Sequence, residues 1–273
     1  MTSPARGRRI ALTVARRLVA DYMWAASGVA RVDVTRRVAF REPTIARSEL
    51  REPPSWTAIF VKAFAIVAAE IPELRRVYLK LPWPHLYEYA DSTASVLQER
   101  QIMGDTGLLP LRFRQPDAVP LGELSEMIRR AADAPIEEAR LYRNLILLAR
   151  LPLVLRRLVW GVGLNIPRLR RNALGTYGVS SVARWETELG TTRSPLPCLL
   201  SYGPADADGR VDVRLNFDHR IFDGALAGRV LTRLEEVLNS SILDELRGLA
   251  GSQARARPAA TAVTAPFAAP SRG

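Results

Sequence analysis

The stretch Asp218-His219-Arg220-Ile221-Phe222-Asp223-Gly224 joins a predicted strand to a predicted helix. Before it, apolar and polar residues alternate from Val211 to Asp218, which is the period-two pattern of a half-buried strand. After it, apolar residues recur at helical spacing, at Leu226, Val230, Leu234, Val237 and Leu238. Because loops between such elements often carry function, this junction is the first candidate for a functional site.

His219 is one of only two histidines in the chain. If the strand continues by one residue, His219 keeps the parity of Val211 and Phe217 and points to the sheltered side, where loss of water favours the neutral imidazole. A neutral imidazole can act as a general base. The plainer interpretation is a core histidine whose hydrogen bonds are satisfied.

Asp223 follows His219 by four residues. It can orient the imidazole directly, or it can bind an arginine that braces the turn, and we favour the second role. The plainer interpretation is a helix N-cap. Gly224 permits a tight backbone at the start of the helix.

These residues resemble the active-site signature His-Arg-x-x-Asp-Gly of the dihydrolipoamide acyltransferases, the core subunits of 2-oxoacid dehydrogenase complexes. Asp218 stands where that family usually has an aspartate before the histidine. Further landmarks follow the family's order along the chain: a basic opening helix with Arg8-Arg9 and Arg16-Arg17, a strand at Arg31–Thr35, a long helix from Trp56, and a Pro72-Glu73-Leu74 turn. The resemblance implies the chloramphenicol acetyltransferase-like fold.

The resemblance also implies a mechanism and an assembly. In the family, a serine or threonine hydroxyl stabilises the oxyanion, and Gly175–Val182 is similar to the strand that carries it. Ser180 takes that position, with Ser181 as the alternative; without the flanking pattern both are ordinary polar residues. His219 then takes the proton of a thiol, and the thiolate attacks a thioester of coenzyme A. The family's site lies between subunits of a trimer and requires no metal.

The chain departs from the family in having no recognisable lipoyl domain or subunit-binding domain. Its only lysines are Lys62 and Lys80, and neither lies in a predicted lipoyl hairpin. We therefore expect no lipoate on this chain and an acyl acceptor, or a lipoyl protein, supplied in trans.

A second departure is the basic, apolar segment 142–171, where relatives have a short connection. Leu151, Val154, Leu155, Leu158 and Val162 fall on one helical face, and Arg150 and Arg157 fall on another. Its central arginines and Pro152 disfavour a membrane span. We expect the apolar face to pack, on the core of the domain or at a subunit contact, with contact to an anionic membrane surface or a lipid substrate as the second alternative.

The mixture of predicted helices and strands indicates an α/β protein with a mixed sheet covered by helices. We predict one catalytic domain over residues 1–250 and a disordered tail rich in alanine and proline over 251–273. The expected elements are helices at Arg8–Trp24, Ser55–Ile71 and Leu121–Ala132, strands around Tyr87–Leu97 and Leu108–Phe113, and the strand and helix that flank His219.

The net charge of +11 attracts anions, but the basic residues are spread along the chain without a nucleic-acid-binding motif, so no nucleic-acid partner is expected. Cys198 is the only cysteine and is predicted to be a buried strand residue, which fits a cytoplasmic location, with peripheral membrane contact as an addition. The leading hypothesis is a CoA-dependent acyltransferase that forms a homotrimer or a larger assembly. The alternatives are a non-catalytic trimeric scaffold and a peripheral membrane-binding protein.

Overall fold

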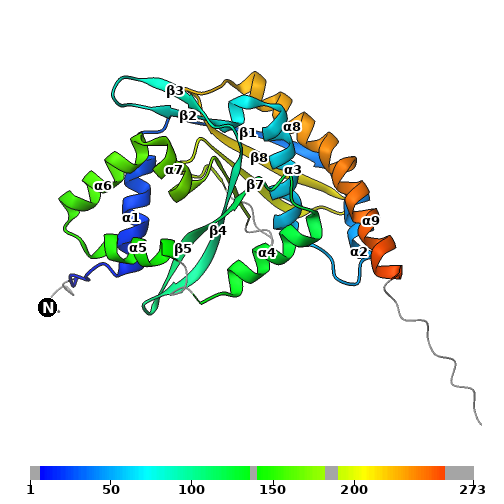
Figure 1. The fold of residues 1–273 in the computed structure, drawn as a ribbon, viewed down its shortest axis with the longest axis horizontal. Helices are drawn as coiled ribbons and strands as arrows, with labels where there is room; N and C mark the ends of the chain where they lie inside the picture. The colour runs from blue at the N-terminus through cyan, green and yellow to red at the C-terminus, as the bar shows by residue number, and fades with distance from the viewer. Residues whose placement is uncertain (1–6, 136–139, 182–189, 256–273) are drawn as a thin grey trace, which may run out of the picture.

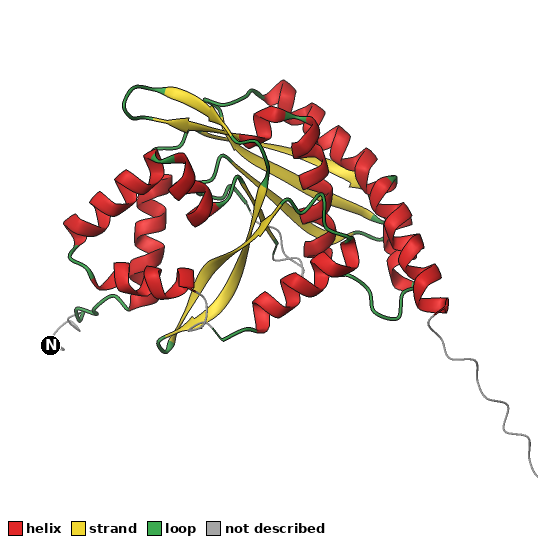
Figure 2. Ribbon diagram, in the orientation of Figure 1, coloured by secondary structure: helices red, strands yellow, loops and turns green. Residues whose placement is uncertain are grey.

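The computed structural model describes residues 7–135, 140–181 and 190–255. Within them, nine α-helices surround a six-stranded mixed sheet and a separate two-stranded hairpin (Figures 1 and 2). The helices are α1 (Val14–Ala26), α2 (Arg41–Ser48), α3 (Trp56–Glu70), α4 (Leu121–Asp133), α5 (Arg140–Arg150), α6 (Leu153–Asn165), α7 (Pro167–Leu174), α8 (Gly224–Asn239) and α9 (Ser241–Arg255). The strands are β1 (Arg31–Ala39), β2 (Arg76–Leu79), β3 (His85–Glu88), β4 (Thr93–Ile102), β5 (Asp105–Arg114), β6 (Tyr177–Ser180), β7 (Cys198–Ala205) and β8 (Arg210–Asp218).

The main sheet has the strand order β1-β8-β7-β6-β4-β5. β6 is parallel to both of its neighbours, β4 and β7, while the other pairs are antiparallel. The mixed sheet covered by helices confirms the predicted fold class. β2 and β3 form the second sheet by themselves.

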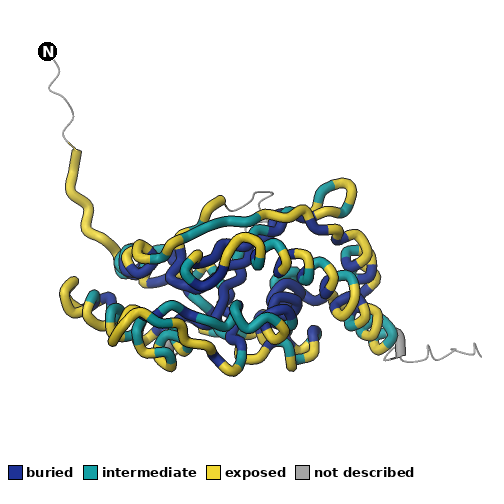
Figure 3. Tube along the Cα trace, turned by 90° about the horizontal axis from the view of Figure 1, so that it is seen from above, coloured by how far each residue is buried: buried dark blue, intermediate teal, exposed yellow. Residues whose placement is uncertain are grey.

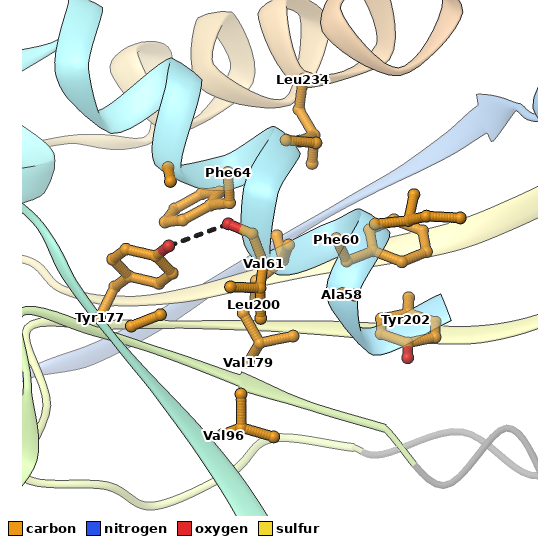
Figure 4. Close-up of a cluster of buried hydrophobic side chains, with 14 of the residues drawn as sticks. Ala58, Phe60, Val61, Phe64, Val96, Tyr177, Val179, Leu200, Tyr202 and Leu234 are labelled. Atoms are coloured by element: carbon orange, nitrogen blue, oxygen red, sulfur yellow. Dashed lines mark hydrogen bonds between the residues drawn. The ribbon is translucent and has the colours of Figure 1, made fainter. Parts of the chain in front are cut away.

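One face of the sheet carries the main hydrophobic core, under α3 and α8 (Figure 4). α3 starts where Ser55 accepts a hydrogen bond from the Ala58 N–H at 3.1 Å, and it is buried along most of its length. The Tyr177 hydroxyl crosses from β6 and donates to the Val61 carbonyl at 2.9 Å. The buried stretches of the chain gather in the interior of the molecule, and the exposed residues lie at its periphery (Figure 3).

The opposite face is covered by α1, α6 and α7, which gather with α5 on the left of Figure 1. A smaller cluster there joins Leu174, Leu196 and Leu199 to the partly buried Tyr22 and Trp160. This second layer contains α6 and α7 of the predicted segment 142–171, which contribute Trp160 and Leu174 to the cluster.

The helical layer is held by a buried charge cluster. Asp21 of α1 is fully buried, and its carboxylate lies 3.5 Å from Arg156 Nε and 3.8 Å from an Arg157 nitrogen. Burial raises the pKa of Asp21, while the two arginines oppose that shift. Arg157 also lies over the Trp24 ring, 4.4 Å from its centre. The segment therefore packs, as predicted.

Several predicted boundaries were wrong. The first helix begins at Val14 rather than Arg8, because the Thr13 hydroxyl caps it by accepting from the Arg16 N–H. The strand predicted around Tyr87–Leu97 is two strands, β3 and β4, in different sheets. α9 continues to Arg255, past the predicted domain end at residue 250, and the rest of the predicted tail lies outside the described residues.

Candidate active site

The turn between β8 and α8 positions His219. β8 ends at Asp218, and the His219 N–H donates to the Ala30 carbonyl at 2.8 Å. His219 is exposed in the single chain, so the predicted sheltered position was wrong: the strand ends one residue early and the alternation stops. His219 Nδ1 lies 3.1 Å from the Phe222 carbonyl oxygen. Because a carbonyl only accepts, Nδ1 carries the proton in this contact, and the lone pair of a neutral imidazole is then on Nε2.

Asp218, and not Asp223, binds the arginine of this turn. The Asp218 carboxylate, nearly fully buried, accepts from Arg220 at 2.8 and 2.6 Å, a bidentate pair. Arg220 also stacks over Tyr78 of β2, 4.1 Å from the ring centre. Asp223 caps α8 by accepting from the Leu226 N–H at 2.9 Å, and no arginine in the described ranges lies within ion-pair distance of it. The arginine-binding role that we predicted for Asp223 was therefore wrong, because Asp218, two residues from Arg220, binds that arginine.

Ser180 and Ser181 lie at the end of β6 and face opposite sides of the sheet. A Cβ added at Gly178 would lie 2.5 Å from Leu199 and 2.7 Å from Leu196, so Gly178, and with it Ser180 two residues on, faces the α1–α6–α7 layer. Ser181 donates to the Tyr202 carbonyl at 2.9 Å and lines a cavity on the α3 face. The structure thus separates the two candidate serines by face.

His219 and Ser180 of one chain lie far apart. The register sets Ser180 level with Ser201, and Ser201 level with Arg214, five residues before His219. At about 3.4 Å per residue and about 4.8 Å per strand, their Cα atoms are roughly 20 Å apart. β8 also runs opposite to β6, so the C-terminal ends of these two strands, which carry the two residues, point in opposite directions along the sheet. Two side chains of one chain therefore do not reach the same carbonyl group.

A cationic cavity of about 320 Å³ lies beside the His219 turn, and sequence reasoning missed it. Lys80, Arg170 and Arg220 line it, together with residues of α1 and α6. Burial lowers the pKa of Arg170 to about 10, so this side chain remains a cation at neutral pH. Arg170 donates to the Leu164 and Pro195 carbonyls at 3.1 and 2.7 Å, which fixes it at the cavity wall. The three cationic residues come from distant parts of the sequence, so no local sequence motif predicts the cavity.

α6 packs with the opposite face from the one we expected. Arg156 is the one residue of α6 that is buried in the described structure, and Arg157 and Trp160 are half-buried, whereas Val154 and Leu158 are 77% and 61% exposed. Val154, Leu155, Leu158 and Val162 share the exposed face of α6, but the predicted pairing of Arg150 with Arg157 was wrong, because Arg150 ends α5 and is exposed. The inward direction was also wrong, because Asp21 attracts Arg156 and Arg157 to the interior. Within the described ranges, no helix is both long and apolar enough to cross a membrane.

The sole cysteine, Cys198, is fully buried in β7, as predicted. Burial raises the pKa of its thiol to about 12, against the opposing effect of Arg31. This thiol is therefore protonated at neutral pH and is not a nucleophile.

No family model and no curated protein matches the sequence. Solved structures do match its fold. A probable dihydrolipoamide acetyltransferase from Listeria monocytogenes is 18% identical, with a TM-score of 0.60, over 88% of this chain and 95% of that one. The chain has the fold of the dihydrolipoamide acetyltransferase core.

Two further structures of this fold match at similar levels. The Azotobacter vinelandii dihydrolipoamide acetyltransferase, studied for the role of a serine, a histidine and an asparagine in its catalytic mechanism, is 17% identical with a TM-score of 0.64, over 88% of this chain and 95% of that one. A truncated catalytic core of the 2-oxoacid dehydrogenase multienzyme complex from Thermoplasma acidophilum is also 17% identical, with a TM-score of 0.64, over 86% of this chain and 99% of that one.

Proposed function

We propose that the protein is an acyltransferase that moves an acyl group between CoA and a thiol or other acceptor supplied in trans. The observation that carries this proposal is the position of the motif in the fold: His219 follows β8, and Ser180 ends β6, in the dihydrolipoamide acetyltransferase fold. The histidine and asparagine studied in the Azotobacter enzyme are four residues apart, as are His219 and Asp223. That spacing supports the assignment of the turn as the catalytic one.

In this mechanism, Nε2 of His219 accepts the proton of an acceptor thiol, and the thiolate attacks the thioester carbonyl carbon. The Ser180 hydroxyl donates a hydrogen bond to the oxyanion that forms. The tetrahedral intermediate collapses, the carbon–sulfur bond to CoA breaks, and the CoA thiolate takes the proton back from the imidazolium. The contact of Nδ1 with the Phe222 carbonyl supports this role, because it holds the lone pair on Nε2.

The proposed active site lies between two chains of a trimer. The separation of roughly 20 Å between His219 and Ser180 supports this assembly, because a second chain has to supply one of the two groups. A further matching structure, described as the cubic core of the pyruvate dehydrogenase multienzyme complex, supports an oligomer of this fold.

The cationic cavity beside His219 is the proposed site for the CoA phosphates. Lys80, Arg170 and Arg220 line it, and among the described residues only Arg220 of the three has a carboxylate partner. A cavity with uncompensated positive charge favours a phosphate ligand.

Thiol release from acyl-CoAs of increasing chain length, with dihydrolipoamide and other acceptors, tests the proposal. His219→Ala is expected to lower the rate at least about 100-fold. His85→Ala, at the only other histidine, is the matched control and is expected to retain the wild-type rate. If neither wild type nor His219→Ala releases thiol from any acyl-CoA, and the protein is confirmed to be a trimer, the non-catalytic scaffold is favoured instead.

Peripheral contact with an anionic membrane is a second candidate role, and the outward face of α6 favours it. Val154, Leu158 and Val162 are exposed there, and residues 140–175 contain no aspartate or glutamate. An apolar face with basic neighbours binds anionic lipid surfaces. Sedimentation with vesicles that contain phosphatidylserine should carry down the wild type more than Val154→Asp. Met103→Asp, at another exposed apolar residue, is the control, and equal sedimentation of all three proteins would remove this role.

A further inference from the structure

A second cavity, of about 150 Å³, lies between the sheet, α1 and the helices of segment 142–171. Its lining is almost wholly apolar. Leu97 and Pro110 form the sheet side, and Leu145, Trp160 and Ala173 come from α5, α6 and α7. Segment 142–171 therefore builds one wall of the cavity.

The cavity lies beside Ser180. On β4, Val96 pairs with Val179 of β6, so Leu97 is level with Ser180 on the adjacent strand. Neighbouring residues at the same level of a sheet point to the same face, and their strands are about 4.8 Å apart. Gly178 confirms the face, because the leucines that limit its space, Leu196 and Leu199, pack against Trp160 and Ala173. The Ser180 side chain thus faces the layer that contains the cavity.

The geometry points to a substrate class: we infer that this cavity binds the apolar chain of the acyl group whose carbonyl oxygen is stabilised by Ser180. The inference rests on the proposed function, and it assigns segment 142–171 a role in selecting the substrate. A carbonyl held at Ser180 has the cavity on the same face, one strand away. A short acyl group such as acetyl leaves the cavity unused.

The volume sets the preferred chain length. An engineered apolar cavity of about 150 Å³ accepts benzene, a group of six carbons. An acyl tail of about six or seven carbons beyond the carbonyl, as in heptanoyl or octanoyl, is therefore the expected limit. Each methylene moved from water into the cavity raises kcat/KM about fourfold. We expect kcat/KM to rise from acetyl-CoA to about octanoyl-CoA and then to level off or fall.

Ala173→Phe tests the inference by filling the cavity. It should lower kcat/KM for octanoyl-CoA by at least about tenfold and leave acetyl-CoA within about twofold. Ala131→Phe is the matched control, because Ala131 is also a partly buried helical alanine but packs against the main core. A similar loss for both substrates in Ala173→Phe, or no loss for either, would overturn the inference. Trp160→Ala enlarges the cavity and should move the optimum to longer chains.

Binding of free octanoate, measured by calorimetry, separates this inference from the proposed function. Octanoate should bind wild type and His219→Ala equally, and Ala173→Phe at least about tenfold more weakly. If no acyl-CoA is turned over, that binding pattern still supports the cavity as an acyl-chain site while the proposed catalysis fails. If octanoate does not bind, or binds Ala173→Phe as well as wild type, the inference is wrong even where acyl transfer is observed.

Discussion

Mixing two inactive variants tests whether the active site is built between chains. His219→Ala keeps Ser180, and Ser180→Ala keeps His219, so each pure protein lacks one group in all of its sites. Because the two residues of one chain are roughly 20 Å apart, a complete site needs His219 from one chain and Ser180 from another. After denaturation and refolding of an equal mixture, each site draws its histidine chain and its serine chain independently. The chain that supplies the histidine carries His219 with probability one half, and the chain that supplies the serine carries Ser180 with probability one half, so about a quarter of the sites are complete.

The assay is thiol release from acyl-CoA, with the trimer confirmed by light scattering. The mixture should recover about 25% of the wild-type rate, while each variant refolded alone stays at its own low rate. Wild type refolded with the His219→Ala/Ser180→Ala double variant gives the same quarter of complete sites and serves as the control for refolding yield. If the mixture of single variants stays inactive while this control recovers activity, both residues act within one chain and the assignment of Ser180 or of the trimeric site is wrong.

Three further perturbations test the charges of the structure. Asp21→Ala leaves Arg156 buried without its ion-pair partner and should lower the free energy of unfolding, measured by urea titration, by about 3–5 kcal/mol. The double variant Asp21→Leu/Arg156→Met should regain most of that free energy. Arg150→Met, at an exposed residue, is the control and should change the free energy of unfolding little. Partial burial would raise the pKa of Glu235, but hydrogen bonds from the Ala39 N–H and Arg36 hold the pKa of this carboxyl group below its usual value. The ionised carboxylate therefore stabilises the fold at pH values above the pKa of the unfolded chain, and this stabilisation is lost as the pH falls through the pKa of the folded protein. Glu235→Gln should therefore flatten the acid limb of the stability curve below about pH 4.5, and an unchanged limb would contradict the role of these bonds. Lys80→Met should raise KM for acyl-CoA several-fold with little change in kcat, and it should leave KM for acyl-pantetheine, which has no phosphates, unchanged. An equal rise in KM for both substrates would exclude phosphate binding at this cavity.

The sequence predicted those parts of the fold that depend on local pattern. α3 and α4 lie within one residue of the predicted ranges, and β8 and α8 flank His219 as predicted. Hydrophobic periodicity and capping residues are enough for such elements, because each buries one face and ends at a local signal. The exposure of His219 depends on where β8 stops, and one residue reverses the side to which a strand residue points. The alternation of apolar and polar residues does not show at which residue the strand ends, so it could not reveal this error.

Contacts between distant segments were beyond the sequence. Lys80, Arg170 and Arg220 form one cavity wall only after β2, α7 and the β8–α8 turn come together. The charge pair of Asp218 with Arg220 was available locally, because the two residues are two positions apart, but the family signature directed attention to Asp223. A resemblance therefore supplies a motif without the partners that its side chains have in this chain.

The orientation of α6 shows how one buried charge changes the meaning of an amphipathic pattern. Periodicity establishes that Val154 and Leu158 share a face and that Arg157 lies on another, but it does not say which face is inside. Asp21, more than a hundred residues earlier, decides this by being fully buried in α1 and attracting Arg156 and Arg157. The arginine side then packs on the protein, with Trp160 at the apolar cavity beside Ser180. The same choice leaves the apolar side outside, so the proposed acyl pocket and the proposed lipid-facing surface both depend on one aspartate.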